Sequence, residues 1–248
     1  MRRVLSPSDN KYSRGIVAVA AGSERFPGAA VLTVGGARRG NAGYVKFLSQ
    51  EKRLQDLVIS RFPDVVPIEN LDGERIDALV VGPGMGSVKK IPERIPLLLD
   101  GESIALATVE GFLDDHPITV ITPHEGELRH CGVEVGRHLD GDARKQIAQK
   151  IARDLGVIIV LKGHATVVAE PEGETFIDEI GGPELATAGS GDLLAGLIGS
   201  FLVSARDIGT AMDQVCRAVT LHSKAGRIAK EKYTSVTALE ILESLAHV

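Results

Sequence analysis

A loop of small residues with one carboxylate leads directly into an apolar stretch at residues 185–198. Gly189 and Gly191 allow backbone angles that a Cβ would forbid, so successive amide N–H groups can converge on one point at the start of a helix. Such a point, together with the helix dipole, stabilises a phosphate that gains negative charge in a transition state. Asp192 lies within reach of a hydroxyl presented to that phosphate and would be the base. The pattern indicates a phosphoryl-transfer site in which Gly189, Ser190 and Gly191 bind the phosphate.

A purely structural interpretation of this loop is also open. Aspartate is a residue type that caps helices, so Asp192 could serve only the helix that follows. Glycines on both sides of a serine are equally typical of a tight turn. The rest of the chain favours the phosphoryl-transfer site over the purely structural interpretation, because it contains further polar loops.

Five short apolar runs in the chain each end in a loop of glycine or polar residues, after Ala21, Val81, Leu99, Ile121 and Leu161. Runs of this kind alternating with helical stretches predict a mainly parallel sheet covered on both faces, with right-handed crossovers. Ligands of such sheets bind at the carboxyl ends of the strands, where all five loops would lie. Lys162 directly follows one buried run, and we expect it to reach a phosphate there.

The loop after Ile121 is dense in ionisable groups. His124 could bond a substrate or a neighbouring carboxylate. Glu125 and Glu127 could hold metal-bound water or complement a helix dipole. Asp100 ends another run, and we expect it to cap the segment that follows rather than to contact a ligand. The glycines after Val81 either admit a ligand close to the backbone or serve only a turn (Gly82, Gly84 and Gly86).

The elements that must position these residues follow from apolar patterning. Ala143, Ile147, Ile151 and Leu155 mark one face of a helix at 140–155, which Asp140 or Asp142 can cap and Gly156 can end. Thr237 and Glu240 have the capping-box spacing and open the last helix. We expect strands at 15–22, 43–48, 77–81, 97–100, 117–121 and 157–161, a hairpin at 167–169 and 175–177, and further helices at 29–37, from the glycine loop to about 203, and at about 207–230.

Length and composition favour one α/β domain at 15–248, preceded by an arm at 1–14 that lies on the surface or on a neighbouring subunit. The 248 residues are 44% hydrophobic, enough for a large core. The net charge of -5 and the scattered cations, paired only at places such as Arg38-Arg39 and Lys89-Lys90, argue against nucleic acid. The chain has no apolar run of about 20 residues for a membrane span.

Cysteine content and the amino-terminal residues bear on the compartment. Only Cys131 and Cys216 occur, and the chain starts without the apolar run of a signal peptide. Both observations favour free thiols and a cytoplasmic location.

Taken in order, these loops resemble the ribokinase-like superfamily and, within it, the ADP- or ATP-dependent NAD(P)H-hydrate dehydratases. The G-S-G-D loop alone indicates only the superfamily, whereas T-P-H-E-G-E at 122–127 together with P-G-A-A at 27–30 points to the dehydratases. The other matching segments are K-Y-S-R-G at 11–15, A-G-S at 21–23, G-P-G-M-G at 82–86, V-L-K-G at 160–163 and L-A-T-A-G-S-G-D-L-L-A-G at 185–196.

The resemblance implies a three-layer α/β sandwich with a mainly parallel sheet, and an enzyme that repairs hydrated NADH and NADPH. In such an enzyme the C6 hydroxyl of the hydrate attacks the terminal phosphorus of ADP or ATP, and phosphate then leaves. Asp192 would be the base, and Ala29, Gly84 and His124 would lie against the dinucleotide. The donor phosphates would follow Lys162, Gly163, His164, Ala165 and Thr166, with Gly191 near the nucleoside. Magnesium would bridge donor oxygens through water, with Glu125 and Glu127 as its candidate contacts.

The resemblance also implies a homo-oligomer, a tetramer in the family, and an epimerase as a pathway partner, since no epimerase domain is fused to this chain. The chain departs from the family pattern at Gly182, Ala188 and Glu102. Two alternative functions stay open: a kinase of the same fold that acts on a vitamin-precursor alcohol, and a nucleotide-binding protein without turnover. Because bacterial members of the family use ADP, the resemblance implies an ADP-dependent (S)-NAD(P)H-hydrate dehydratase, with ATP as the alternative donor.

Overall fold

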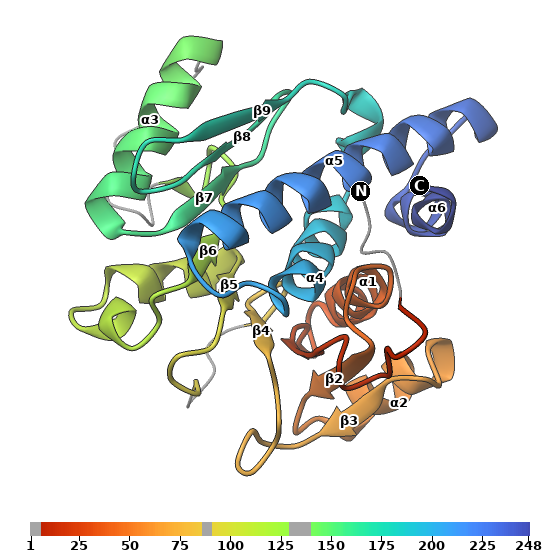
Figure 1. Ribbon diagram of the computed structural model, residues 1–248. Helices are drawn as coiled ribbons and strands as arrows, with labels where there is room; N and C mark the ends of the chain where they lie inside the picture. Colours follow the sequence, from red (N-terminus) through yellow and green to blue (C-terminus); the bar gives the residue numbers. More distant parts are fainter. Residues whose placement is uncertain (1–5, 86–90, 129–139) are drawn as a thin grey trace.

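The structure is a computed structural model that describes residues 6–85, 91–128 and 140–248 (Figure 1). Gly86, Lys89, Lys90 and Cys131, which the sequence analysis singled out, lie outside these residues, as do the first five of the expected arm. Residues 6–14 form turns beside β2, where the ring of Tyr12 meets that of Tyr44 edge-on at 6.2 Å.

The nine strands found in the described residues form one sheet in the order β3-β2-β1-β4-β5-β6-β7-β8-β9. The strands from β3 to β7 are parallel, and β8 and β9 add an antiparallel hairpin at one edge. Their bounds are β1 (Ile16–Ala20), β2 (Tyr44–Leu48), β3 (Val66–Ile68), β4 (Ala78–Val81), β5 (Leu97–Leu99), β6 (Thr119–Ile121), β7 (Ile158–Leu161), β8 (Thr166–Ala169) and β9 (Thr175–Asp178).

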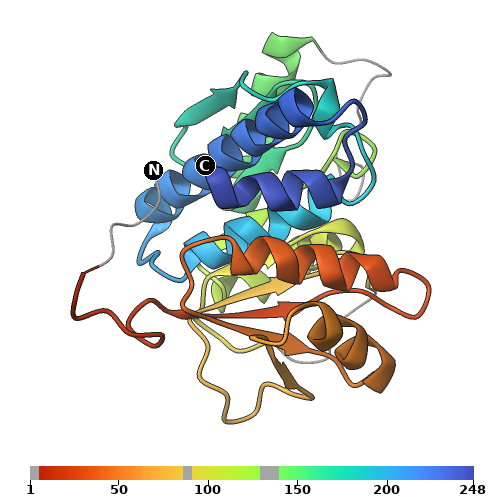
Figure 2. The same ribbon diagram turned by 90° about the vertical axis from the view of Figure 1, so that its right-hand side faces the viewer.

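Helices cover both faces of this sheet, which gives the three layers that the resemblance implies. Side chains alternate along β1, so Val17 and Val19 pack into one apolar core while Ala18 and Ala20 pack into the other. The first core includes side chains of α1 (Pro27–Arg38), α2 (Lys52–Arg61), α4 (Ser190–Leu202), α5 (Ile208–Lys232) and α6 (Ala238–Ser244), of which α1, α5 and α6 lie in front of the sheet in Figure 2. The second includes α3 (Gly141–Leu155) and the 3-10 helix η1 (Gly101–Thr108). The remaining 3-10 turns are η2 (Phe112–Asp114), η4 (Pro183–Leu185) and η5 (Leu245–His247).

Close packing between α1 and α4 sets the position of the G-S-G-D loop. A Cβ built on Gly196 of α4 would lie 1.8 Å from the carbonyl oxygen of Thr33, and one on Gly36 of α1 would lie 2.1 Å from that of Leu193. Glycine at both positions lets the two backbones touch, as no larger residue would. The start of α4 is thereby held against α1.

The expected strands, the hairpin and the capped helices are confirmed, with two differences. The buried stripe of α3 consists of Arg144, Ala148, Ile151 and Ala152, one step around the helix from the predicted face, and Ala143, Ile147 and Leu155 are only half-buried. The elements α2 and β3 were not predicted. Cys216 is a half-buried free thiol.

Candidate active site

The loop that carries Asp192 opens α4 as the sequence predicts. Gly189 is its N-cap and lies in the left-handed region, with a φ of 87°. A Cβ built there would lie 2.2 Å from Cδ1 of Leu32, so only glycine fits without strain. Asp192 lies in the first turn after that cap and therefore does not cap the helix itself. The interpretation that Asp192 is the helix cap is therefore wrong.

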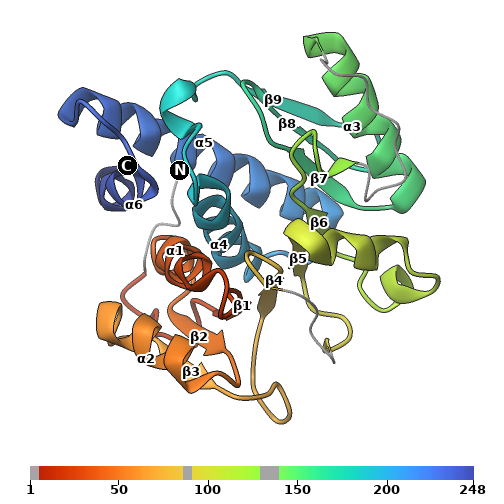
Figure 3. The ribbon, with the colours of Figure 1, turned by 180° about the vertical axis from the view of Figure 1, so that it is seen from behind.

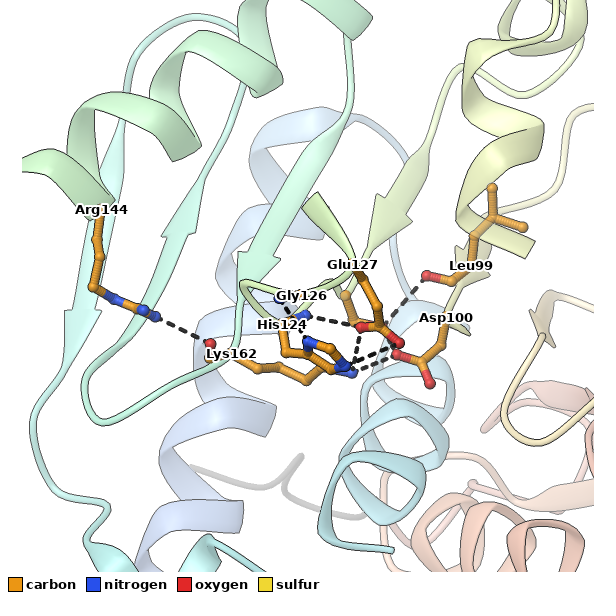
Figure 4. A network of polar contacts seen from close by, with 8 residues as sticks. Leu99, Asp100, His124, Gly126, Glu127, Arg144 and Lys162 are labelled. Carbon is orange, nitrogen blue, oxygen red and sulfur yellow. Dashed lines mark hydrogen bonds and ion pairs between the residues drawn. The ribbon is translucent and has the colours of Figure 1, made fainter. Parts of the chain in front are cut away.

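Lys162 reaches across the carboxyl edge of the sheet toward the same point. Its Nζ donates to Oδ1 of Asp100 at 2.7 Å and lies 3.7 Å from Oε2 of Glu127 (Figure 4). A Cβ built on Gly191 would lie 3.4 Å from this Nζ, so the ammonium touches the start of α4. Burial alone would lower the pKa of Lys162, but Asp100, Glu127 and Asp192 together raise it. The lysine is therefore a fixed cation beside the G-S-G-D loop.

Asp192 is poised to change its protonation state near neutrality. Burial raises its pKa, the charges of Asp100 and Glu127 raise it further, and Lys162 lowers it, with a result of about 6. A carboxylate with that pKa is ionised at pH 7 yet accepts a proton more readily than an ordinary aspartate. This is the property expected of a general base.

Asp100 does not have the role predicted for it. It precedes η1, but its side chain makes no capping hydrogen bond. Instead its Oδ1 accepts hydrogen bonds from Oγ1 of Thr122 at 2.6 Å and from Lys162. Its side chain is 7% exposed, so these two donors offset the cost of burying the charge. The aspartate orients the lysine, and the expectation of a cap is wrong.

The turn at residues 162–166 is held from behind by Arg144. One of its terminal nitrogens donates to the carbonyl oxygens of Leu161, Lys162 and Ala165 at 3.1–3.3 Å. The other forms an ion pair with Glu125 (Figure 4 shows the bond to Lys162). The arginine is buried, and its bonds to three carbonyl oxygens fix the shape of the turn.

A hollow of about 610 Å³ lies between this turn and the start of α4. It brings together most of the residues predicted to bind the nucleotide and the phosphate. The predicted residues that line it are His124, Lys162, Gly163, His164, Thr166, Ser190 and Gly191, and they are joined by Gly182, Pro183, Leu185, Ala186, Thr187, Leu194 and His222. Ala165, whose carbonyl oxygen accepts a hydrogen bond from Arg144, does not line the hollow, and neither do Gly189 and Asp192.

Ala29 and Gly84, predicted to contact the substrate, form a separate group, with Ala29 in the first turn of α1 and Gly84 in the loop after β4. A Cβ built on Gly84 would lie 2.5 Å from the Cβ of Ala29. The carbonyl oxygen of Gly84 accepts a hydrogen bond from Oγ of Ser23 at 2.7 Å. Of the other two predicted substrate residues, His124 lines the hollow of about 610 Å³ and Asp192 lies in the first turn of α4.

The two glutamates proposed to contact metal-bound water have different partners in the structure. Glu125 is engaged by Arg144. Glu127 accepts the backbone N–H of His124 at 2.9 Å and faces the ring of His124, with 3.5 Å between Oε1 and Nε2. Within the described ranges, no group of three or more His, Cys, Asp or Glu residues could hold a metal directly.

The sequence model of the NAD(P)H-hydrate dehydratase family matches residues 17–247, which is nearly the whole chain. This chain belongs to that family. Among curated relatives, the ADP-dependent (S)-NAD(P)H-hydrate dehydratase of Lactococcus lactis is 31% identical over 255 residues, which cover 95% of this chain and 89% of that protein.

Longer relatives and a solved structure agree with the membership in this dehydratase family. The bifunctional NAD(P)H-hydrate repair enzyme of Mycobacterium tuberculosis is 36% identical over 221 residues, covering 84% of this chain but 45% of that protein. The chain thus spans about half the length of such relatives. The ADP/ATP-dependent NAD(P)H-hydrate dehydratase of Bacillus subtilis, co-crystallised with ATP and Mg²⁺, superposes with a TM-score of 0.85 at 26% identity over 98% of this chain and 92% of that one.

Two polar residues of this dehydratase-family chain were missed at the sequence level. Arg144 was overlooked because the predicted apolar face of α3 was displaced by one residue. His222 lies on α5, is buried, and has its Nε2 3.2 Å from Oγ of Ser190. Burial lowers its pKa to about 4, although the Ser190 backbone opposes the shift, so the ring is neutral at pH 7. A histidine inside the apolar stretch of a long helix was the available signal.

No helix in the parts of the chain that the structure describes has the length and apolar character of a membrane span.

Proposed function

We propose that this chain dehydrates hydrated NADH and NADPH at the expense of a phosphoanhydride of ADP or ATP. Membership in the dehydratase family supports the reaction class. The observation that carries the assignment is the position of Asp192, a carboxylate with a pKa of about 6 that directly follows Gly191 and interacts with Lys162, two residues that line a hollow of about 610 Å³.

Asp192 accepts the proton of the C6 hydroxyl as its oxygen attacks the terminal phosphorus of the donor. The P–O bond to the rest of the donor breaks, and the amides of Gly189, Ser190 and Gly191 stabilise the charge that develops. The ring nitrogen then expels phosphate by cleavage of the C6–O bond, and loss of a proton from C5 restores the dihydropyridine. Each step needs a base or an anion site, and both lie at the start of α4.

The donor binds in the hollow between the 162–166 turn and α4. Lys162 offers an ammonium to its phosphates, and the turn offers backbone groups that Arg144 holds in place. His222 keeps Ser190 in position from the buried side.

The charge around Lys162 suits a hydrated magnesium ion rather than one bound directly by several side chains, since the described residues offer no direct metal site. Asp100, Glu127 and Asp192 place three carboxylates around one ammonium, so the site carries an excess of negative charge that a divalent cation would balance. Magnesium retains several waters when it binds, and Glu127 and Asp192 would contact those waters. When bound, the ion would neutralise charge on the donor phosphates.

The biological setting follows from the same proposal. An NAD(P)H-hydrate epimerase would interconvert the two epimers of the substrate for this enzyme, a role supported by the bifunctional repair enzymes among its relatives. We further propose a homo-oligomer in the cytoplasm, a tetramer by resemblance.

The decisive assay incubates the protein with hydrated NADH, Mg²⁺ and either ADP or ATP, and follows the absorbance of the restored dihydropyridine. We expect recovery with stoichiometric release of phosphate. No recovery with either donor would reject the proposal. A kinase of the same fold would instead consume donor and retain a phosphate ester on an alcohol, and a protein without turnover would bind nucleotide only.

A further inference from the structure

A second hollow, of about 390 Å³, lies over the carboxyl ends of β1 and β2 and the segment that follows β3. None of the residues discussed so far as catalytic or nucleotide-binding lines it. Its described lining consists of Ala20, Ala21, Gly22, Leu48, Ser49, Gln50, Glu51, Leu54, Glu69, Asn70, Leu71, Asp72 and Met85.

The strand order places this hollow and the residues Asp100 and Lys162 on opposite sides of the point where the order reverses. Going outward, β1, β2 and β3 run to one side of the sheet and β4, β5 and β6 to the other, so the order reverses between β1 and β4 (Figure 3). Dinucleotides bind across the crevice at such a switch point. The loops on its two sides are tied together, because the N–H of Gly22 donates to the carbonyl oxygen of Pro83 at 2.7 Å and Ser23 donates to Gly84.

The distance between the second hollow and the reacting centre suits the two ends of one extended ligand. Asp100, which marks the reacting centre, follows β5, whereas the second hollow centres on the end of β2. Three strand spacings lie between β5 and β2, or about 14 Å at the usual distance between neighbouring strands. A dinucleotide with its nicotinamide ring at Asp192 would therefore carry its other nucleoside toward the second hollow, past Gly22 and Gly84.

The lining of the second hollow matches a nucleoside without a phosphate on its ribose. Leu48, Leu54 and Met85 supply apolar surface for a base. Glu51 and Glu69, which follow β2 and β3, supply carboxylates that can accept hydrogen bonds from ribose hydroxyls. None of the described lining residues carries a positive charge. A carboxylate after the second strand of such a sheet bonds a 2′-hydroxyl and repels a 2′-phosphate.

We propose that the second hollow binds the adenosine half of the dinucleotide and that Glu51 and Glu69 make the site favour the NADH form over the NADPH form. This inference rests on the proposed function for the identity of the substrate. It goes beyond that function in assigning a subsite and a preference between its two substrates.

The test is direct binding of NADH and NADPH, followed by cofactor fluorescence, with saturating ADP and Mg²⁺ so that the nucleotide hollow is filled. We expect NADH to bind about tenfold more tightly at low salt, with a smaller ratio at high salt because Glu51 and Glu69 are exposed. Glu69→Lys should reduce or reverse the ratio. Glu172→Lys, in the exposed turn between β8 and β9, is the matched control and should leave it unchanged.

Equal affinities for NADH and NADPH, or a ratio that Glu69→Lys does not alter, would overturn the inference. Dehydration of both hydrates with equal efficiency would also overturn it while leaving the proposed function intact. A protein that retains the NADH preference but restores neither hydrate would instead contradict the proposed function.

Discussion

Lys162 and Asp100 join the ends of two strands that are not neighbours. Their Nζ and Oδ1 atoms lie 2.7 Å apart, although β6 separates β7 from β5 in the sheet. The ion pair draws the ammonium along the carboxyl edge until it lies beside the start of α4 and Asp192. The same cation thus holds down the pKa of the base and faces the hollow where donor phosphates would bind.

Removal of the lysine should weaken nucleotide binding. Lys162→Ala is expected to raise the dissociation constant for ADP at least about tenfold, because a charge-assisted bond to a phosphate is lost. Calorimetric titration with ADP measures this directly. Lys224→Ala, which removes an exposed lysine of α5, is the control. Unchanged affinity in Lys162→Ala would remove the lysine from the binding site.

The rate of dehydration should depend on the ionised form of Asp192. Because its pKa is about 6, kcat/KM is expected to fall tenfold per pH unit below pH 6 and to level off above it. The charge of Asp100 raises that pKa, so Asp100→Asn should move the acid limb to lower pH even if the maximum rate is reduced. The range from about pH 5 to about pH 7 extends roughly one unit to each side of this pKa. A value of kcat/KM that stays constant over this range would contradict the role of Asp192 as the base.

Arg144 should matter for both folding and nucleotide binding. Arg144→Ala leaves the carbonyl oxygens of Leu161 and Lys162 and the carboxylate of Glu125 without their donor. We expect a loss of about 3 kcal/mol in the free energy of unfolding, measured with urea, and weaker binding of ADP. Arg153→Ala, at the exposed end of the same helix, should change stability by less than about 0.5 kcal/mol. A loss no larger than that of the control would show that the turn does not depend on the arginine.

The lowered pKa of His222 should make the stability of the folded protein depend on pH. Its pKa is about 4 in the folded protein and 6.5 in an unfolded chain, so the unfolded chain binds more protons between these values. The contribution of the neutral ring is present above pH 6.5 and is lost as the pH falls toward 4. The stability difference between wild type and His222→Gln should therefore decrease by up to about 3 kcal/mol between pH 7 and pH 4. A difference that is independent of pH would refute the assignment of a buried neutral ring.

The sequence predicts the parts of this protein that depend on local chemistry. Glycines at a helix start, the capping box of Thr237 and Glu240, and the runs that form the strands all depend on neighbours in the chain. The element α2 was missed because it is a mostly polar helix with little buried surface, and β3 because it has three residues and contains Pro67.

Long-range partners explain the remaining failures. Asp100 was expected to cap the segment that directly follows it, but its side-chain partners Thr122 and Lys162 lie 22 and 62 residues away in the sequence. Arg144 similarly donates to carbonyl oxygens at the end of β7, and these acceptors come within reach only when β7 packs beside α3. The hollow itself depends on packing between the 162–166 turn and α4, which no local pattern specifies.

The most direct test of the whole account replaces the base alone. Asp192→Asn keeps the size of the side chain and removes its ability to accept the hydroxyl proton. We predict that restoration of NADH from its hydrate, measured in a single turnover with ADP and Mg²⁺, slows at least about 10²-fold while the dissociation constant for ADP stays within a factor of about three. A variant that restores NADH at nearly the wild-type rate would contradict the central claim that Asp192 is the catalytic base.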